Sequence, residues 1–267
     1  MNYLNSKFDF LKPIKIESLK RVGVKKDGGY IVDYNIVLNT DYLLSFGMGT
    51  DWSFESEYIR LNKKGVVHIY DYSINFYTFL RPFFKYLKRF LTFRLSYKDL
   101  LIRFNFFKEY IKFINCKNVN FFKEKISKNI EKNIKTTSTD EAFDRLEKIN
   151  KIIMKIDIEG SEYEVFEEVI KNYNKIEMLI IEFHEIDKHE IQFEYIVKKL
   201  KKYFDIVHLH GNNHCGLAKS GIPKALEITM ISNKYKPTKI NYEKNFPNKY
   251  LDYPNDPCKN DLFFNFK

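Results

Sequence analysis

The sequence is poor in cysteine, and the few cysteines it has are scattered. Cys116, Cys215 and Cys258 are odd in number, lie far apart and form no C-x-x-C pair, so neither a disulfide framework nor a paired-cysteine zinc site is expected. No apolar run approaches the roughly 18 residues that a membrane span requires, and the N-terminus has no signal-peptide core. We therefore expect reduced thiols and a soluble, cytoplasmic protein without stable membrane insertion.

Acidic residues are outnumbered by basic ones, and the formal net charge is +10. This charge would attract an anionic partner such as nucleic acid, an anionic membrane or a nucleotide-linked substrate. Lys, Asn, Ile, Phe and Tyr are all abundant, however, as an AT-rich genome would produce without selection for binding. The charge alone therefore selects no partner. The length of 267 residues suits one large α/β domain, and we expect a single domain over 1–267.

The most informative stretch is KIDIEGSEY, residues 155–163. Residues 151–158 form an apolar, β-branched run of strand length that ends on Asp157 and Glu159, and Gly160 follows. Ser161 with Glu164 reads as a capping box that starts a helix. In an open α/β sheet the carboxyl ends of the strands face the ligand crevice, so we expect Asp157 and Glu159 at a functional site. The alternative is that these acids only solvate a turn.

A second strand–turn–helix unit lies near the N-terminus. Residues 36–38 and the mostly apolar 41–46 are expected to form the strand that leads into Gly47 and Gly49, after which Ser53 reads as a helix cap. The next strand, residues 66–71, ends on Asp71 about 20 residues after the glycine turn, a spacing at which a carboxylate reaches ribose hydroxyls in nucleotide-binding folds. This pairing indicates a nucleotide-like cofactor.

Residues 74–116 interrupt this pattern with a block dense in Phe, Tyr, Lys and Arg, which we interpret as inserted helices. The block would serve as a lid over the substrate, as a basic membrane-facing surface, or simply as a helical pair with an aromatic core. We favour the lid or the helical pair, because aromatics recur around much of the helix and leave no clean lipid-facing stripe.

Alternating strands and helices resume after the insertion and predict a doubly wound parallel α/β sheet. The expected strands span residues 119–122, 178–184, 206–210 and 226–231, the last of them possibly antiparallel, and Ser138 with Glu141 opens a helix between them. A further helix is expected through Tyr195 to Tyr203. The tail, residues 237–267, is rich in Asn, Pro and Tyr, and we expect it to wrap the surface irregularly.

The motifs distinguish among nucleotide folds. A dinucleotide fingerprint would need a third glycine at Trp52, and a P-loop would need G-x-x-x-x-G-K-[ST], which the chain lacks. A glycine turn with a strand-ending acid but without that third glycine fits an S-adenosylmethionine methyltransferase better than a dehydrogenase.

The 155–162 motif resembles the signature of the FkbM family of S-adenosylmethionine-dependent O-methyltransferases. Segments 27–30, 45–49, 69–71 and 181–184 follow in the order of that family, and 210–213 resembles an element of one subgroup. The resemblance implies a seven-stranded class I methyltransferase sheet, with Gly47, Gly49 and Asp71 at the cofactor. The chain departs from the pattern in having Ser45 where an acid usually opens the glycine motif and Asp51 where a glycine is common. Asp27 or Asp51 would then hold the cofactor's ammonium group.

Methyl transfer to a hydroxyl requires alignment and one base. Period-two alternation places Glu182 with His184, and His208 with His210, on single faces of their strands. We expect His184 as the base, because a neutral imidazole accepts a proton near neutral pH, with Asp157 or Glu182 orienting it and His210 as the second choice. Glu182, His208 and Asn212 are expected to contact the acceptor. Each histidine has the alternative of a purely structural role.

A divalent metal, Mg²⁺ or Mn²⁺, is a further option at Asp157, Glu182 and a histidine, although the spacing does not identify one. We expect the acceptor to be a sugar hydroxyl, in a nucleotide-linked sugar or glycan for a capsule or other surface polysaccharide, whose diphosphate the basic insertion would receive. A homodimer is left open. Two alternatives remain: an RNA methyltransferase or basic RNA-binding module, and a non-catalytic scaffold. The RNA reading is disfavoured because Ile-Glu-Gly follows Asp157 in place of an Asn/Asp-Pro-Pro-aromatic turn.

Overall fold

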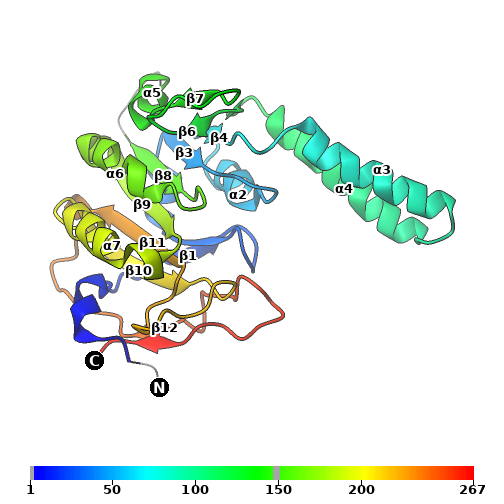
Figure 1. Cartoon of the computed structure of the whole chain (residues 1–267). Coiled ribbons are helices and arrows are strands. Elements are labelled where there is room, and N and C mark those ends of the chain that lie inside the picture. The colour runs from blue at the N-terminus through cyan, green and yellow to red at the C-terminus, as the bar shows by residue number, and fades with distance from the viewer. Residues whose placement is uncertain (1–2, 147–150) are drawn as a thin grey trace.

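The computed structural model describes residues 3–146 and 151–267 and is built on a seven-stranded sheet (Figure 1). From one edge to the other its strands are β10 (Phe204–Gly211), β11 (Leu226–Ser232), β9 (Ile176–Phe183), β8 (Ile152–Ile156), β3 (Tyr42–Phe46), β4 (Val66–Tyr70) and β5 (Val119–Phe122). Strands β9, β8, β3, β4 and β5 are parallel, and β11 is antiparallel to both β9 and β10. The predicted doubly wound sheet with an antiparallel last strand is confirmed.

Helices cover both faces of the sheet, because alternate residues of its central strands face opposite sides and both sides are apolar. Leu44 and Met154 pack in one core with helices α5 (Thr139–Asp144), α6 (Glu162–Lys171) and α7 (Ile186–Leu200). Leu43 and Ile153 pack in a second core with α1 (Tyr34–Asn39) and α2 (Ser53–Leu61). Burial on both faces explains why these strands read as continuous apolar runs.

The insertion forms a helical hairpin, α3 (Phe76–Leu91) and α4 (Tyr97–Ile114), between β4 and β5. The hairpin projects from the sheet as a long arm (Figure 1). Its base packs on Trp52, whose ring centroid lies 5.6 Å from that of Phe79 and 5.5 Å from that of Tyr110. The predicted inserted helices are thus confirmed. None of the described helices is long and apolar enough to cross a bilayer.

Three short two-stranded sheets accompany the central sheet. They are β1 (Leu19–Val22) with β2 (Tyr30–Asp33), β6 (Lys125–Ile126) with β7 (Thr136–Thr137), and β12 (Asn245–Phe246) with β13 (Phe264–Asn265). Short 3₁₀ turns lie at η1 (Ser6–Leu11), η2 (Tyr173–Lys175) and η3 (Asn233–Tyr235). The tail is therefore less irregular than expected, since β12 and β13 pair within it.

Several local predictions are wrong at element boundaries. Residues 36–38 lie in helix α1, because the carboxylate of Asp33 accepts hydrogen bonds from the backbone amides of Asn35 and Ile36 and starts a helix there. Helix α7 ends at Leu200, before Tyr203. The capping box of Ser138 and Glu141 is confirmed.

The two serine caps expected beside the glycine turns do not form. At α2 the cap position is Trp52, and the Ser53 hydroxyl instead accepts a hydrogen bond from the amide of Val24. At α6 Ser161 makes no capping hydrogen bond. The carboxylate of Glu162 turns back instead and accepts hydrogen bonds from the amides of Ile158 and Gly160. A longer acidic side chain thus replaces the serine at the turn that follows β8.

Candidate active site

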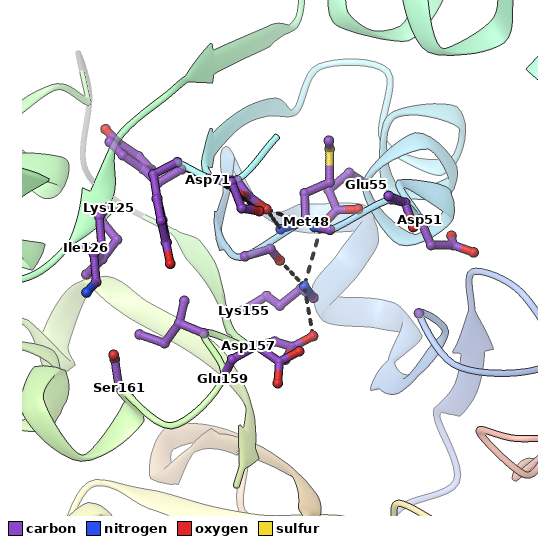
Figure 2. Close-up of a pocket in the computed structure, with 18 of the residues that line it drawn as sticks. Met48, Asp51, Glu55, Asp71, Lys125, Ile126, Lys155, Asp157, Glu159 and Ser161 are labelled. Atoms are coloured by element: carbon purple, nitrogen blue, oxygen red, sulfur yellow. Dashed lines mark hydrogen bonds and ion pairs between the residues drawn. The ribbon is translucent and has the colours of Figure 1, made fainter. Parts of the chain in front are cut away.

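A cavity of about 500 Å³ opens at the carboxyl ends of β3, β4 and β8 (Figure 2). Seven of the residues predicted for the site line it: Asp27, Gly47, Gly49, Asp51, Asp71, Asp157 and Glu159. Parallel strands bring their carboxyl ends to one edge of a sheet, which explains why residues so far apart in sequence meet here. The predicted proximity of Gly47, Asp71 and Asp157 is present in the structure.

The glycine turn after β3 fits only without a side chain at its first position. Gly47 has φ of 78°, and a Cβ there would lie 1.7 Å from the backbone oxygen of Asp157. This close approach places the glycine loop directly against the end of β8. Gly49 also has positive φ, 59°, but a Cβ there would meet nothing within 4 Å. The open space beside Gly49 is available to a ligand.

Asp71 holds the glycine loop in place. Its Oδ2 accepts hydrogen bonds from the amides of Met48 at 3.0 Å and Gly49 at 2.9 Å. Its Oδ1 accepts from the amide and the hydroxyl of Ser73. The carboxylate therefore shapes the cavity wall, and its contact with cofactor hydroxyls remains a prediction.

Glu55 is the acid that the sequence reasoning missed. It lies on α2, lines the cavity, is almost fully buried and accepts a hydrogen bond of 2.7 Å from the Ser45 hydroxyl. It thus stands beside the position where the family usually has an acid and this chain has Ser45. Asp51 is partly used as an acceptor for the amide of Ser53, and Asp27 accepts from the side chain of Asn255 at 3.1 Å. Glu55 joins Asp27 and Asp51 as a candidate partner for an ammonium group.

Lys155 is a buried cation in the middle of β8 and was also missed. Its ammonium group donates to the carbonyl of Gly47 and lies 3.6 Å from Asp157 and 3.9 Å from Glu55 (Figure 2). Burial lowers the pKa of Lys155, but the charges of Asp157 and Glu55 outweigh burial and raise it above its ordinary value. Lys155 therefore stays charged and offsets part of the negative charge of the cavity.

His184 lies directly after β9 and faces a group of carboxylates. Its Nδ1 is hydrogen-bonded to Oε1 of Glu162 at 3.0 Å. Its Nε2 lies 3.6 Å from Glu159, 3.7 Å from Glu182 and 4.0 Å from Asp157. Asp157 is shared with the cavity, and its other oxygen accepts a hydrogen bond of 2.8 Å from the Tyr30 hydroxyl. The predicted group of Asp157, Glu182 and His184 is thus assembled beside the cavity.

The charges of this group govern its proton affinity. Burial lowers the pKa of His184, but the hydrogen bond to Glu162 and the charges of Glu182 and Asp157 outweigh burial and raise it to about 10. Burial, Asp157 and Glu227 together raise the pKa of Glu182 well above its ordinary value. In this structure His184 is therefore protonated at neutral pH.

The remaining predicted residues divide into two groups. Asn212 donates a hydrogen bond of 2.7 Å to Glu182, so it supports the His184 group. His208 and His210 do not line the cavity; both are buried and paired with acids of the C-terminal tail. Nε2 of His208 lies 2.8 Å from Asp252, and Nε2 of His210 lies 3.2 Å from Asp261. These long-range partners make a structural role the better description of both histidines.

The sheet order, the glycine turn of β3 and the acid that ends β4 define a class I methyltransferase fold of the Rossmann-like α/β type. A family model described as the methyltransferase FkbM domain matches residues 23–211. This match covers more than half of the chain, which therefore belongs to the FkbM methyltransferase family. Family and fold imply S-adenosylmethionine as the methyl donor.

Solved structures with a similar fold include three methyltransferase-related proteins. The fibrillarin pre-rRNA processing protein of Methanococcus jannaschii is 11% identical over 86% of this chain and 76% of that chain, with a TM-score of 0.40. Precorrin-6y C5,15-methyltransferase of Geobacter metallireducens is 10% identical over 74% and 84%, with a TM-score of 0.36. A putative rRNA methylase of Clostridium thermocellum is 9% identical over 74% and 92%, with a TM-score of 0.38. No curated protein matches the sequence.

Proposed function

We propose that this methyltransferase is an O-methyltransferase that acts on a sugar hydroxyl, in a nucleotide-linked sugar used for a capsule or another surface polysaccharide. The observation that carries the proposal is the position of Asp157, which belongs both to the glycine-loop cavity and to the His184 group. A donor in the cavity and an acceptor against His184 would meet at this carboxylate.

The reaction that such a site supports is a displacement at carbon. The acceptor oxygen forms a bond to the methyl carbon while the carbon–sulfur bond breaks, and the electron pair of that bond stays on sulfur. The hydroxyl proton must leave as the new bond forms. His184 is the proposed base, with Asp157 and Glu182 around its Nε2, and Lys155 holds Asp157 and the glycine loop in register.

The proposed acceptor follows from the charges near the cavity. Among the residues that the structure describes, no residue of 74–116 lines the cavity, so the insertion makes no contact there in this conformation. The cavity wall contains Lys125 as well as Asp157 and Glu159. The ammonium group of Lys125 pairs with Glu131, and a diphosphate would compete with that carboxylate for it, while the acids would bind hydroxyl groups. This mixed lining favours an acceptor that carries both kinds of group.

The test combines binding and turnover. Calorimetry with S-adenosylmethionine measures the donor site, and labelled donor with a panel of nucleotide sugars, read by mass spectrometry, measures transfer. Methylation of a sugar oxygen in one or more nucleotide sugars is expected. Absence of donor binding at millimolar concentration would reject the enzyme, whereas label in RNA and in no sugar would replace the acceptor by RNA.

A further inference from the structure

We propose that Asp157, Glu182 and His184 form a binding site for one divalent cation of the Mn²⁺ or Mg²⁺ class, which rests on the proposed function because the ion would face the acceptor hydroxyl. Their ligand atoms, two carboxylate oxygens and Nε2, all lie within 4.8 Å of one another. Glu182 lies in β9, and Asp157 and His184 directly follow the adjacent strands β8 and β9, so the sheet fixes the backbone positions from which all three extend.

The distances at Nε2 fit an ion better than hydrogen bonds. The carboxylate oxygens of Glu182 and Asp157 lie 3.7 and 4.0 Å from it, beyond hydrogen-bonding distance. An octahedral ion with bonds of about 2.1 Å sets its ligand atoms about 3 Å apart at adjacent positions and about 4 Å apart at opposite ones. Small side-chain movements would bring all three atoms to one centre.

Supporting hydrogen bonds orient the ligands as metal sites require. Glu162, which is 2% exposed, holds Nδ1 of His184 at 3.0 Å and leaves Nε2 directed at the carboxylates. A carboxylate on the far nitrogen of a histidine is the usual support of a metal ligand. Asn212 donates to Glu182 at 2.7 Å and fixes that side chain in the same way.

A neighbouring group of acids lacks this character. Asp27, Glu182 and Glu227 also lie close together, but the side-chain amide of Asn255 already donates to both Asp27 and Glu227, at 3.1 and 2.8 Å. That amide stabilises two of the three carboxylates by hydrogen bonds, so this group does not require an ion. In the histidine group Tyr30 and Lys155 contact only Asp157, and Asn212 donates only to Glu182. No donor among the described residues bridges these two carboxylates as Asn255 bridges Asp27 and Glu227, which favours the histidine group as the cation site.

The choice of cation follows from the donor set. Carboxylate oxygens suit Mg²⁺ and Mn²⁺, and an imidazole nitrogen shifts the preference towards Mn²⁺. Since Asp157 also lines the cavity, the open side of the ion faces the space where the acceptor would lie. A hydroxyl bound there would lose its proton more easily, which assists attack on the donor methyl group. With Nε2 on the ion and Nδ1 held by Glu162, His184 would then be a ligand and not the base, and the hydroxyl proton would pass to water.

The test uses Mn²⁺ itself with the full chain. Electron paramagnetic resonance of free Mn²⁺ during titration gives stoichiometry and affinity, and we expect one site that His184→Asn and Glu182→Gln weaken by about tenfold or more. Glu227→Gln is the matched control, a buried carboxylate that also borders Glu182, and it should retain the ion. No binding at millimolar Mn²⁺, or equal loss in all three variants, overturns the site.

Two further measurements keep the outcome clear. Anomalous diffraction from a Mn²⁺-soaked crystal of the unaltered chain locates the ion without any variant, and a peak away from Nε2 of His184 overturns the proposal. Calorimetry with S-adenosylmethionine in chelator separates the two hypotheses. Methyl transfer at full rate in chelator would reject the metal site but not the proposed reaction. Mn²⁺ binding at this site without any binding of S-adenosylmethionine would reject the proposed reaction but not the metal site.

The hairpin of α3 and α4 carries a second, independent inference. Helix α3 presents an apolar stripe at spacings of three and four residues, formed by Tyr77, Leu80, Phe84, Leu87 and Leu91. Tyr77, Phe84 and Leu91 are 61%, 56% and 67% exposed, and Phe93 in the connection is 98% exposed. The expectation that the aromatics leave no clean stripe is therefore wrong for α3.

Charge identifies what covers this stripe. The hairpin carries the basic residues Arg81, Lys85, Lys88, Arg89, Arg94, Lys98, Arg103, Lys108 and Lys112 against the acidic residues Asp99 and Glu109. Helix α3 contains no acid, so pairing with α3 of a second copy would bring like charges together. Basic residues beside exposed Leu, Phe and Tyr are typical of helices that lie on anionic bilayers. We infer that the hairpin docks on an anionic lipid surface without spanning it.

Vesicle flotation tests the docking surface. The unaltered chain should float with vesicles of phosphatidylcholine and phosphatidylglycerol, less so in high salt, and the triple variant Tyr77→Ser, Phe84→Ser, Leu91→Ser should bind about tenfold or more weakly. The control variant Ile130→Ser, Ile191→Ser, Tyr250→Ser removes exposed apolar groups outside the hairpin and should float normally. Equal flotation of the triple and control variants would overturn the lipid surface. So would light scattering that shows a dimer for the unaltered chain and a monomer for the triple variant alone.

Discussion

The carboxylate of Glu162, the first residue of α6, lies 3.0 Å from Nδ1 of His184, which directly follows β9. The same carboxylate accepts hydrogen bonds from the amides of Ile158 and Gly160. One side chain therefore fixes both the turn that follows β8 and the imidazole that faces Asp157. The turn and the proposed base are held as one unit.

Replacing His184 should separate chemistry from donor binding. His184→Ala should lower turnover below detection while the affinity for S-adenosylmethionine is preserved, because the imidazole lies outside the glycine-loop cavity. Calorimetry and transfer assays measure the two effects. His189→Ala, an exposed histidine on the following helix, is the control and should keep its turnover. Unchanged turnover in His184→Ala would remove this residue from catalysis.

Glu55 should contribute to donor affinity through the ammonium group. Glu55→Gln keeps the size of the side chain and removes its charge, and we expect the Kd for S-adenosylmethionine to rise by roughly tenfold. Glu57→Gln changes the same residue type on the same helix outside the cavity and should leave the Kd unchanged. If Asp27→Asn or Asp51→Asn raises the Kd and Glu55→Gln does not, the cofactor's ammonium group is bound by Asp27 or Asp51, as the sequence predicts, and not by Glu55.

The two glycines of the turn should differ in their tolerance of a methyl group. Gly49→Ala should cost about 1–2 kcal/mol of stability, the penalty for positive φ in a residue with Cβ. Gly47→Ala should cost more, because the added carbon would also meet the Asp157 carbonyl at 1.7 Å. Thermal denaturation of the two variants measures the difference. Equal stabilities would show that the approach of the glycine loop to β8 is not tight.

Acid should weaken the contact between the tail and the sheet. Asp252 is buried against His208, and although burial opposes ionisation, the charges of His208 and His210 and the hydrogen bond to His208 lower the pKa of Asp252 below its ordinary value of 3.8. A carboxyl whose pKa is lower in the folded state stabilises the fold above its unfolded pKa, and this stability is lost as the pH falls.

The difference in unfolding free energy between the unaltered chain and Asp252→Asn should therefore be largest near neutral pH and shrink below about pH 4. Urea denaturation at several pH values measures it. A difference that stays constant between neutral pH and pH 3 would contradict the ionised state of Asp252 in the fold.

The central sheet was predictable because its strands are buried on both faces. A run such as 152–156, apolar except for Lys155, leaves few interpretations other than a central parallel strand, and the acid that follows it must then lie at the crevice. The cap at Asp33 was missed, because residues 36–38 are apolar enough to suggest a strand. The role of Glu162 was missed as well, because its carboxylate turns back to the amides of Ile158 and Gly160 before the helix, and Ser161 makes no capping bond.

The partners of the site could not be read from local sequence. Glu55 reaches Ser45 only because α2 packs back along β3, and Lys155 is buried between acids that come from separate elements. His208 and His210 have the right alternation for a site, yet Asp252 and Asp261 of the distant tail engage them. Such pairings depend on the path of the whole chain, which no local spacing specifies.

Trp52 joins two parts of the molecule that the sequence keeps separate. Its ring contacts Phe79, Phe106 and Tyr110 at the root of the hairpin, and it immediately follows Asp51 in the cavity wall. A tilt of the hairpin relative to the sheet would therefore act first on this indole, which the backbone joins to Asp51. The proposed lipid contact of the hairpin and the proposed donor site would influence each other through Trp52.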